Sequence, residues 1–137
     1  MKKKILIVYA NYYSKISKDL LDGALKFLNK TYNLNLFNGG VVITEVPGVF
    51  EIPVTIATRI KKYDGFIALG CVIKGQTPHF DFISSATTNA IMKLSIDYKK
   101  PIGNGIITCL NIKQAIVRSV KKGQEAANAV GIVLEKL

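Results

Sequence analysis

The 137 residues carry a formal net charge of +10, with 19 lysines and arginines against 9 acidic residues, and 49% of them are hydrophobic. This balance excludes a disordered chain, and no apolar run reaches the roughly 20 residues that a membrane-spanning helix needs. The lysines are scattered, without interleaved aromatic residues or a base-reading motif, so the sequence predicts a cytoplasmic protein that binds neither nucleic acid nor a membrane.

The predicted elements alternate between strands and helices. Residues 4–10 form an apolar run that is too short for a signal peptide and lacks a small-residue cleavage site, which favours a buried strand. Apolar residues then recur at helical spacing from Ile16 to Leu28. In chain order, the pattern predicts a strand at 4–10, a helix at 14–30, a strand at 41–46, a short helix through Ile56 and Ile60, a strand at 66–72, a helix at 78–98, a strand at 102–109, and two closing helices at 111–120 and 123–137.

This alternation predicts one α/β domain over residues 1–137. Right-handed crossovers would give a flavodoxin-like three-layer sandwich, a four-stranded parallel sheet flanked by helices on both faces. In such sheets, ligands bind beyond the carboxyl ends of the strands. The rule selects four segments as the candidate site: residues 11–15, 47–51, 72–79 and 108–111.

The segment 72–79 has the features of an anion-binding loop before a helix. Thr77 is predicted as the N-cap and Pro78 as the first helical residue, which would leave backbone N–H groups free for a phosphate. Lys74 adds positive charge, and Gly75 lets a ligand approach the main chain. A well-capped helix without any ligand fits the same pattern.

His79 is the only histidine of the chain. Its predicted place in the first turn of the helix, beside the anion site, makes it the candidate for proton transfer near neutral pH. A capping or packing histidine is the alternative.

Three further positions are candidates on weaker grounds. Glu51 would lie in the first turn of the short helix, as a ligand or merely as a capping acid, and Phe50 beside it is predicted to be in the core. Tyr12 or Tyr13 could stack on a planar heterocycle, while one of them packs under the first helix. Arg118 offers a guanidinium fork for phosphate, although a surface charge is also compatible with its position.

Other chemistries find no support in the sequence. Cys71 and Cys109 have no CxxC spacing, and one histidine is too few for a zinc site, so neither a metal site nor a disulfide is predicted. Nucleotide-binding glycine motifs are also missing, and no cofactor is expected.

Four segments carry recognisable motifs: residues 46–53 (VPGVFEIP), 70–81 (GCVIKGQTPHFD), 105–108 (GIIT) and 114–118 (QAIVR). They resemble motifs of the lumazine synthase family, and the first two are similar to its most specific ones. The resemblance covers residues 4–137.

The resemblance implies a cofactor-free enzyme of riboflavin biosynthesis. It would condense 5-amino-6-(D-ribitylamino)uracil with 3,4-dihydroxy-2-butanone 4-phosphate to 6,7-dimethyl-8-ribityllumazine, in a homopentamer or larger assembly with active sites between subunits. By position, His79 would transfer protons. The aminouracil and its ribityl chain would contact Tyr12, Val49, Phe50, Glu51, Cys71, Val72, Ile73 and Asn104. The butanone phosphate would contact Gln76, Thr77 and Arg118.

Three features depart from the family pattern. Asn104 stands where many members have Phe, which implies weaker binding of the heterocycle. Only residues 119–123 connect the two predicted closing helices, where capsid-forming members have a longer turn. The sequence also begins directly before the first strand, without the N-terminal extension of many relatives.

Three other functions remain compatible with parts of the sequence. The archaeal type of riboflavin synthase has a related fold, although the motif around His79 argues against it. A flavin- or lumazine-binding protein would keep the pocket without turnover. A nucleic-acid-binding module is suggested by the net charge alone.

Overall fold

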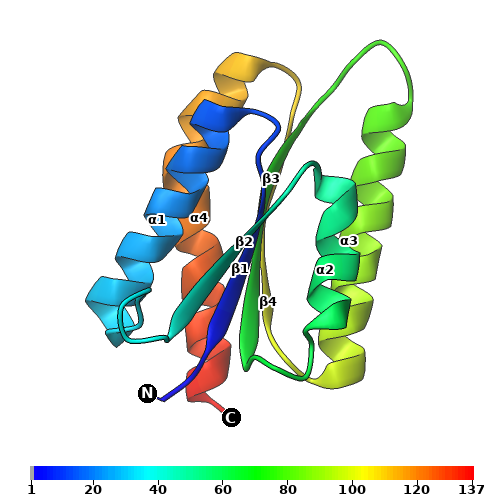
Figure 1. Cartoon of the computed structure of the whole chain (residues 1–137). Coiled ribbons are helices and arrows are strands. Elements are labelled where there is room, and N and C mark those ends of the chain that lie inside the picture. The colour runs from blue at the N-terminus through cyan, green and yellow to red at the C-terminus, as the bar shows by residue number, and fades with distance from the viewer. Residues whose placement is uncertain (1) are drawn as a thin grey trace.

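The computed structural model describes residues 2–137 and contains one four-stranded parallel sheet with the strand order β2-β1-β3-β4 (Figure 1). The strands are β1 (Ile5–Ala10), β2 (Val41–Val46), β3 (Gly65–Ile73) and β4 (Ile102–Cys109). The helices are α1 (Ser14–Tyr32), the short 3-10 helix η1 (Val49–Glu51), α2 (Ile52–Thr58), α3 (His79–Tyr98) and α4 (Ile112–Glu135). The predicted α/β fold with its parallel sheet is confirmed.

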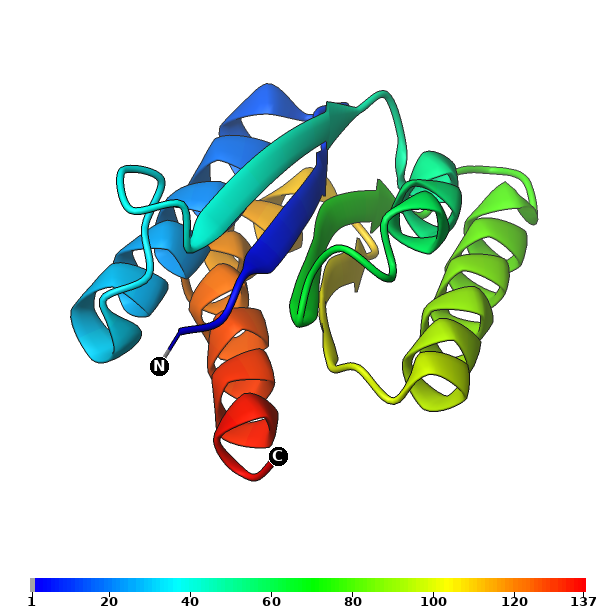
Figure 2. The same cartoon turned by 60° about the horizontal axis from the view of Figure 1, so that its bottom comes forward.

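Helices cover both faces of the sheet. Helices α1 and α4 lie on one face and α2 and α3 on the other, as Figures 1 and 2 show. Because both faces are covered, strand β1 contributes alternate side chains to two cores. Ile5 and Ile7 belong to the core that includes residues of α1 and α4, whereas Leu6 and Val8 belong to the core that includes residues of α2. The apolar run of residues 4–10 is therefore continuous because the strand is buried on both faces, as predicted.

Helix α1 is longer than predicted and ends in a left-handed residue. It continues to Tyr32, and Asn33 follows with a φ of 54°. The backbone N–H of Asn33 donates to the carbonyl of Asn29 at 3.0 Å, which satisfies a carbonyl that the helix end would otherwise leave free. Asparagine tolerates this conformation better than most residues.

The prediction of two closing helices is wrong, because α4 is a single helix from Ile112 to Glu135. Gly123 was interpreted as the end of a turn over residues 119–123. It is instead buried inside the helix, and a Cβ on it would overlap the backbone carbonyl of Leu20 in α1. Glycine is present because the two helices touch through their backbones, and this contact offsets the ~1 kcal/mol by which glycine weakens a helix interior.

The short helix after β2 also differs slightly from its prediction. Residues 49–51 form a 3-10 turn, and α2 ends at Thr58 rather than continuing through Ile60. Ile60 nevertheless lies in the core, with an exposure of 4%. The predicted apolar position is therefore correct and the helix boundary is not.

Candidate active site

The four segments selected from the sequence meet at one edge of the sheet. All four strands are parallel, so their carboxyl ends lie together, at the top of Figure 1. Two backbone hydrogen bonds connect neighbouring strand ends: Asn11 donates to the carbonyl of Val46 at 3.1 Å, and Lys74 donates to the carbonyl of Cys109 at 2.9 Å. This edge is the candidate active site.

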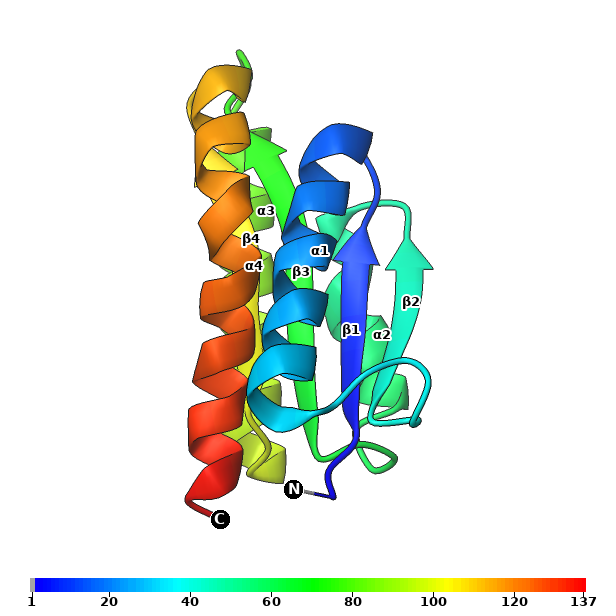
Figure 3. The same cartoon turned by 90° about the vertical axis from the view of Figure 1, so that its left-hand side faces the viewer.

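Strand β3 projects beyond β1 at this edge (Figure 3). Its pairing with β1 ends at Leu69, whereas its pairing with β4 continues to Ile73. Residues 70–73 therefore extend about 13 Å with no strand partner on the β1 side. Backbone N–H and C=O groups on that side are available to a planar ligand with hydrogen-bonding edges.

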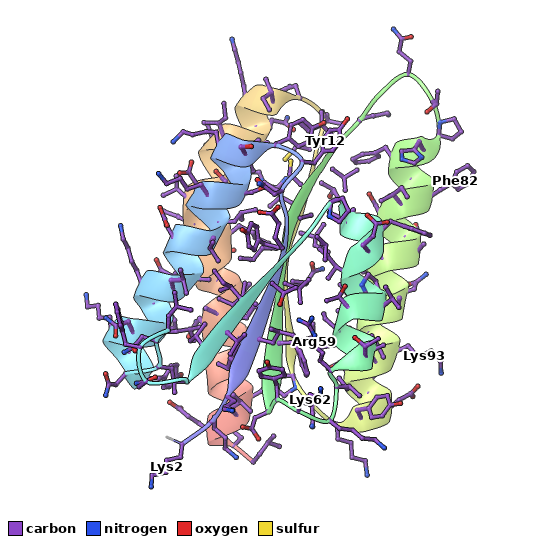
Figure 4. All side chains as sticks on the ribbon, in the orientation of Figure 1. Lys2, Tyr12, Arg59, Lys62, Phe82 and Lys93 are labelled. Carbon is purple, nitrogen blue, oxygen red and sulfur yellow. The ribbon has the colours of Figure 1, made fainter. Side chains whose placement is uncertain are left out.

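Two tyrosines follow β1 and have different environments. Tyr12 is 74% exposed at the carboxyl end of the sheet (Figure 4), whereas Tyr13 is half-buried against the core. Their rings are edge-to-face, with centroids 4.9 Å apart. Burial raises the pKa of the Tyr13 phenol, and the nearby Cys71 and Tyr12 raise it further. Tyr12 thus has the free aromatic face, and Tyr13 is the tyrosine that packs.

The turn after β2 places Val49 inward and Phe50 outward. Val49 is 7% exposed, and a Cβ on Gly70 would overlap its Cγ1, so glycine in β3 makes room for it. Phe50 is 61% exposed, and its prediction as a core residue is wrong. In a three-residue 3-10 turn only one side chain can point at the sheet, and Val49 takes that place.

Glu51 occupies the N-cap position of α2 but does not cap it. Its carboxylate makes no capping hydrogen bond to the helix, and it folds back over Gly48, whose added Cβ would lie 3.1 Å from Oε1. The capping alternative is therefore not what the structure has. A half-buried carboxylate without a capping role remains available to donors of a ligand.

The loop before α3 differs from its prediction by one residue. The helix begins at His79 with Pro78 as its N-cap, so Thr77 is not the N-cap and Pro78 is not the first helical residue. The hydroxyl of Thr77 still accepts a long hydrogen bond, 3.4 Å, from the N–H of His79. The predicted helix start is one residue too early, because the first carbonyl that accepts hydrogen bonds from the helix is that of Pro78. It accepts from the N–H groups of Asp81 and Phe82 at 3.1 and 3.2 Å.

His79 and its loop are exposed. Residues 74–79 are all solvent-accessible, so His79 is not a packing histidine. Apart from Gly75 and its two chain neighbours, no residue has an atom within 4 Å of the position that a Cβ on Gly75 would take. An approaching anion would therefore meet the loop main chain beside Lys74 and Gln76 without steric hindrance.

Arg118 is exposed, and its guanidinium contacts the end of β4. Its Nη1 donates to the carbonyl of Thr108 at 3.1 Å and to Sγ of Cys109 at 3.4 Å. Burial raises the pKa of the neighbouring Cys71 thiol to about 12; Cys109 raises it as well, and Arg118 lowers it. Cys71 is therefore a neutral thiol near pH 7 and not a nucleophile. The contact with the strand end was missed because nothing in the sequence relates Arg118 to a carbonyl ten residues earlier.

Asn104 is not brought to this edge. It pairs with Ala68 in the middle of the sheet, five residues before Cys109 and about 16 Å from it along the strand. Its Oδ1 accepts a hydrogen bond from the N–H of Ile106 at 3.1 Å. Within one chain, Asn104 and the other predicted site residues do not form a common pocket.

Two separate hollows flank the candidate site. One, of about 400 Å³, lies between α2 and α3 and is lined by Phe50, Glu51 and Thr87, together with Pro53, Val54, Ala86 and Ala90. The other, of about 480 Å³, is lined by Arg118, Lys113, Gln114 and Val117 of α4. Phe50 and Glu51, assigned to the aminouracil, and Arg118, assigned to the phosphate, thus line different hollows. The Oγ1 of Thr87 is buried without a hydrogen-bond partner among the described residues.

Residues 2–137 contain no group of three or more metal-ligating His, Cys, Asp or Glu side chains. In the same part of the chain, no helix combines the length and the apolar character needed to cross a membrane.

Comparison with known proteins agrees with the fold and the motifs. A model of the 6,7-dimethyl-8-ribityllumazine synthase family matches residues 2–137. The chain is 41% identical to the 6,7-dimethyl-8-ribityllumazine synthase of Buchnera aphidicola subsp. Baizongia pistaciae, across 99% of this chain and 86% of that protein. Proteins of the same name from Bartonella bacilliformis and Agrobacterium fabrum are 42% and 41% identical, across 91% and 98% of this chain and 84% and 94% of theirs. The chain therefore belongs to the 6,7-dimethyl-8-ribityllumazine synthase family.

Proposed function

We propose that this chain condenses 5-amino-6-(D-ribitylamino)uracil with 3,4-dihydroxy-2-butanone 4-phosphate to give 6,7-dimethyl-8-ribityllumazine, the penultimate step of riboflavin biosynthesis. The observation that carries the proposal is the unpaired edge of residues 70–73. It offers alternating backbone donors and acceptors to a pyrimidine, between the exposed Tyr12 and the loop that leads to His79.

In this proposal the aminouracil lies along the end of β3. The backbone groups of Cys71 and Ile73, which point away from β4, hydrogen-bond the pyrimidine, and Val72 lines it between them. The ring of Tyr12 stacks on the pyrimidine, which contributes ~1 kcal/mol beyond the area buried. The ribityl hydroxyls reach Glu51 through the turn that also carries Val49 and Phe50. The uncapped carboxylate of Glu51 supports this role, because it can accept hydrogen bonds from hydroxyl groups.

The butanone phosphate is assigned to the loop before α3 and to Arg118. Gln76 and Thr77 lie in an exposed loop at the N-terminus of a 20-residue helix, where the dipole and free N–H groups favour an anion. Arg118 supplies a full positive charge and a planar fork that matches phosphate geometry. The net charge of +10 favours the approach of an anionic substrate.

His79 is the proposed proton-transfer residue. The amine of the uracil attacks the ketone and water leaves to form an imine; phosphate is then eliminated, and ring closure with loss of water gives the lumazine. Each step moves a proton between nitrogen, carbon and oxygen atoms, and a positioned imidazole typically accelerates such transfers by ~10²–10⁴-fold. Holding the two substrates in register supplies a further ~7–11 kcal/mol.

The proposed assembly is a cytoplasmic homopentamer with active sites between subunits. The separation of the two hollows supports this arrangement, because a neighbouring copy would bring an Arg118 surface against a Phe50 surface. Asn104 would enter the site of a neighbour in the same way. Exposed apolar side chains on α3, among them Phe82 in Figure 4, are the surface that such a copy would cover.

The direct test is to mix the purified protein with both substrates and to follow the fluorescence of the lumazine product. Turnover by the wild type and its loss in His79→Ala, with unchanged affinity for the aminouracil, is the expected result. A protein that binds the substrates without turnover would be a lumazine-binding protein. Formation of riboflavin from 6,7-dimethyl-8-ribityllumazine alone would indicate a riboflavin synthase.

A further inference from the structure

Cys109 occupies the junction between the two elements assigned to the phosphate. Its backbone carbonyl accepts a hydrogen bond from the N–H of Lys74 at 2.9 Å, which ties the loop before α3 to the end of β4. Its thiol accepts a hydrogen bond from Nη1 of Arg118 at 3.4 Å. One residue at the end of a buried strand therefore contacts both elements assigned to the phosphate, which in the proposed assembly serve two neighbouring active sites.

The contact orients the guanidinium of Arg118. Nη1 is shared between the carbonyl of Thr108 and the thiol of Cys109, whereas no hydrogen bond from Nε or Nη2 to the rest of residues 2–137 occurs. The remaining edge, Nε with Nη2, is the pair of parallel donors that binds a phosphate in a bidentate way. Fixing Nη1 on the protein holds that edge outward.

Both ends of the contact are rigid. Cys109 is 1% exposed and belongs to the core beneath α1 and α4. The start of α4 is fastened by two side chains: Asn111 accepts from the N–H of Gln114 at 3.0 Å, and Gln114 accepts from the N–H of Leu110 at 2.8 Å. This variant of a capping box limits fraying of the turn before Arg118.

We infer that Cys109 is a positioning residue for the butanone phosphate, acting through its thiol on the orientation of Arg118. The inference rests on the proposed function, because it concerns the substrate that Arg118 is proposed to bind. It makes a specific distinction between substitutions: the thiol is needed as a hydrogen-bond acceptor and not only as a filler of the core. Serine retains an acceptor at this position, whereas alanine does not.

The experiment compares Cys109→Ala, Cys109→Ser and the packing control Ile107→Val, which removes a methyl group from the same face of β4. Cys109→Ala should raise the KM for the butanone phosphate, and the inhibition constant of inorganic phosphate, by about three- to tenfold. The KM for the aminouracil should change less than twofold. Cys109→Ser should restore most of the phosphate affinity, and Ile107→Val should lower the melting temperature without a selective change in KM.

A double-mutant cycle separates this inference from the proposed function. In an Arg118→Ala background, Cys109→Ala should have no further effect on the KM for the phosphate substrate, since it acts only through the arginine. Full additivity of the two effects, or equal values for the alanine and serine variants, would overturn the positioning role. A wild-type protein without turnover would instead refute the proposed function, and inorganic phosphate binding would still report on Cys109.

Discussion

Replacing Arg118 with alanine should weaken the binding of the butanone phosphate more than that of the aminouracil. The substitution removes a full charge and the free Nε–Nη2 edge, which in our proposal makes two charge-assisted hydrogen bonds. Such bonds contribute about 1.5–3 kcal/mol each, and part of the loss is recovered when water fills the site. A net loss of roughly 3 kcal/mol corresponds to about a 100-fold increase in the KM for the phosphate substrate.

The assay is steady-state formation of the lumazine, with each substrate varied at a saturating concentration of the other. The KM for the aminouracil should change less than about threefold, since its proposed contacts lie on β3 and Tyr12. The KM of Arg118→Lys for the phosphate substrate should lie between those of the wild type and Arg118→Ala, because lysine keeps the charge and loses the planar fork. Arg59→Ala is the matched control, because it removes the only other arginine. The Nη1 of Arg59 donates to Thr44 at 2.6 Å, and in Figure 4 the residue lies below the carboxyl ends of the strands.

Equal increases for both substrates would contradict the phosphate assignment and would indicate a general loss of structure. If Arg59→Ala raised the KM for the phosphate substrate as much as Arg118→Ala does, the effect would come from net charge. An unchanged KM for both substrates would remove Arg118 from the site.

Four further predictions follow from the same contacts. Tyr12→Ala should raise the KM for the aminouracil by about fivefold with little effect on the phosphate substrate, in the same kinetic assay, as expected for the loss of ~1 kcal/mol of stacking. His79→Gln should lower kcat by ~10²-fold or more in the same assay. Gly123→Ala should destabilise the fold by about 1–3 kcal/mol in urea unfolding, because its Cβ would overlap the Leu20 carbonyl, whereas Asn128→Ala on the exposed side of α4 should be neutral or stabilising. Iodoacetamide at pH 8 should modify Cys71 far more slowly in the folded than in the urea-unfolded chain, measured by mass, because burial raises the pKa of its thiol to about 12.

The strands and the candidate edge were predictable because their signals are local. Residues 66–72 are apolar without interruption, and the observed β3 adds only Gly65 and Ile73 to them. A parallel sheet then places the carboxyl ends of all strands at one edge, so the candidate edge follows from the parallel direction of the strands. Which of the two tyrosines faces solvent and which packs against the core was not predicted, since Tyr12 and Tyr13 are adjacent and chemically similar.

Gly123 shows what a local signal cannot decide. A glycine after two lysines is typical of a helix end, and the same glycine is required where two helix backbones meet. The deciding atom is the carbonyl of Leu20, about a hundred residues away in the chain. The prediction that Phe50 is a core residue was wrong for a related reason. Its neighbour Val49 packs against Gly70 of β3, and the sequence pattern alone does not show which of the two side chains faces the sheet.

The unequal lengths of β1 and β3 connect the fold to the chemistry. If β1 continued to the end of β3, its backbone would pair with residues 70–73 and no edge would remain for a ligand. Strand β1 instead ends at Ala10, and the N–H of the next residue, Asn11, donates to the carbonyl of Val46 on β2. On the opposite side, β4 stays paired with β3 up to Cys109, where Arg118 is held. Because β1 ends early, the backbone proposed to bind the aminouracil is exposed. Because β4 does not end early, the strand end that contacts Arg118, the residue proposed to bind the phosphate, is retained.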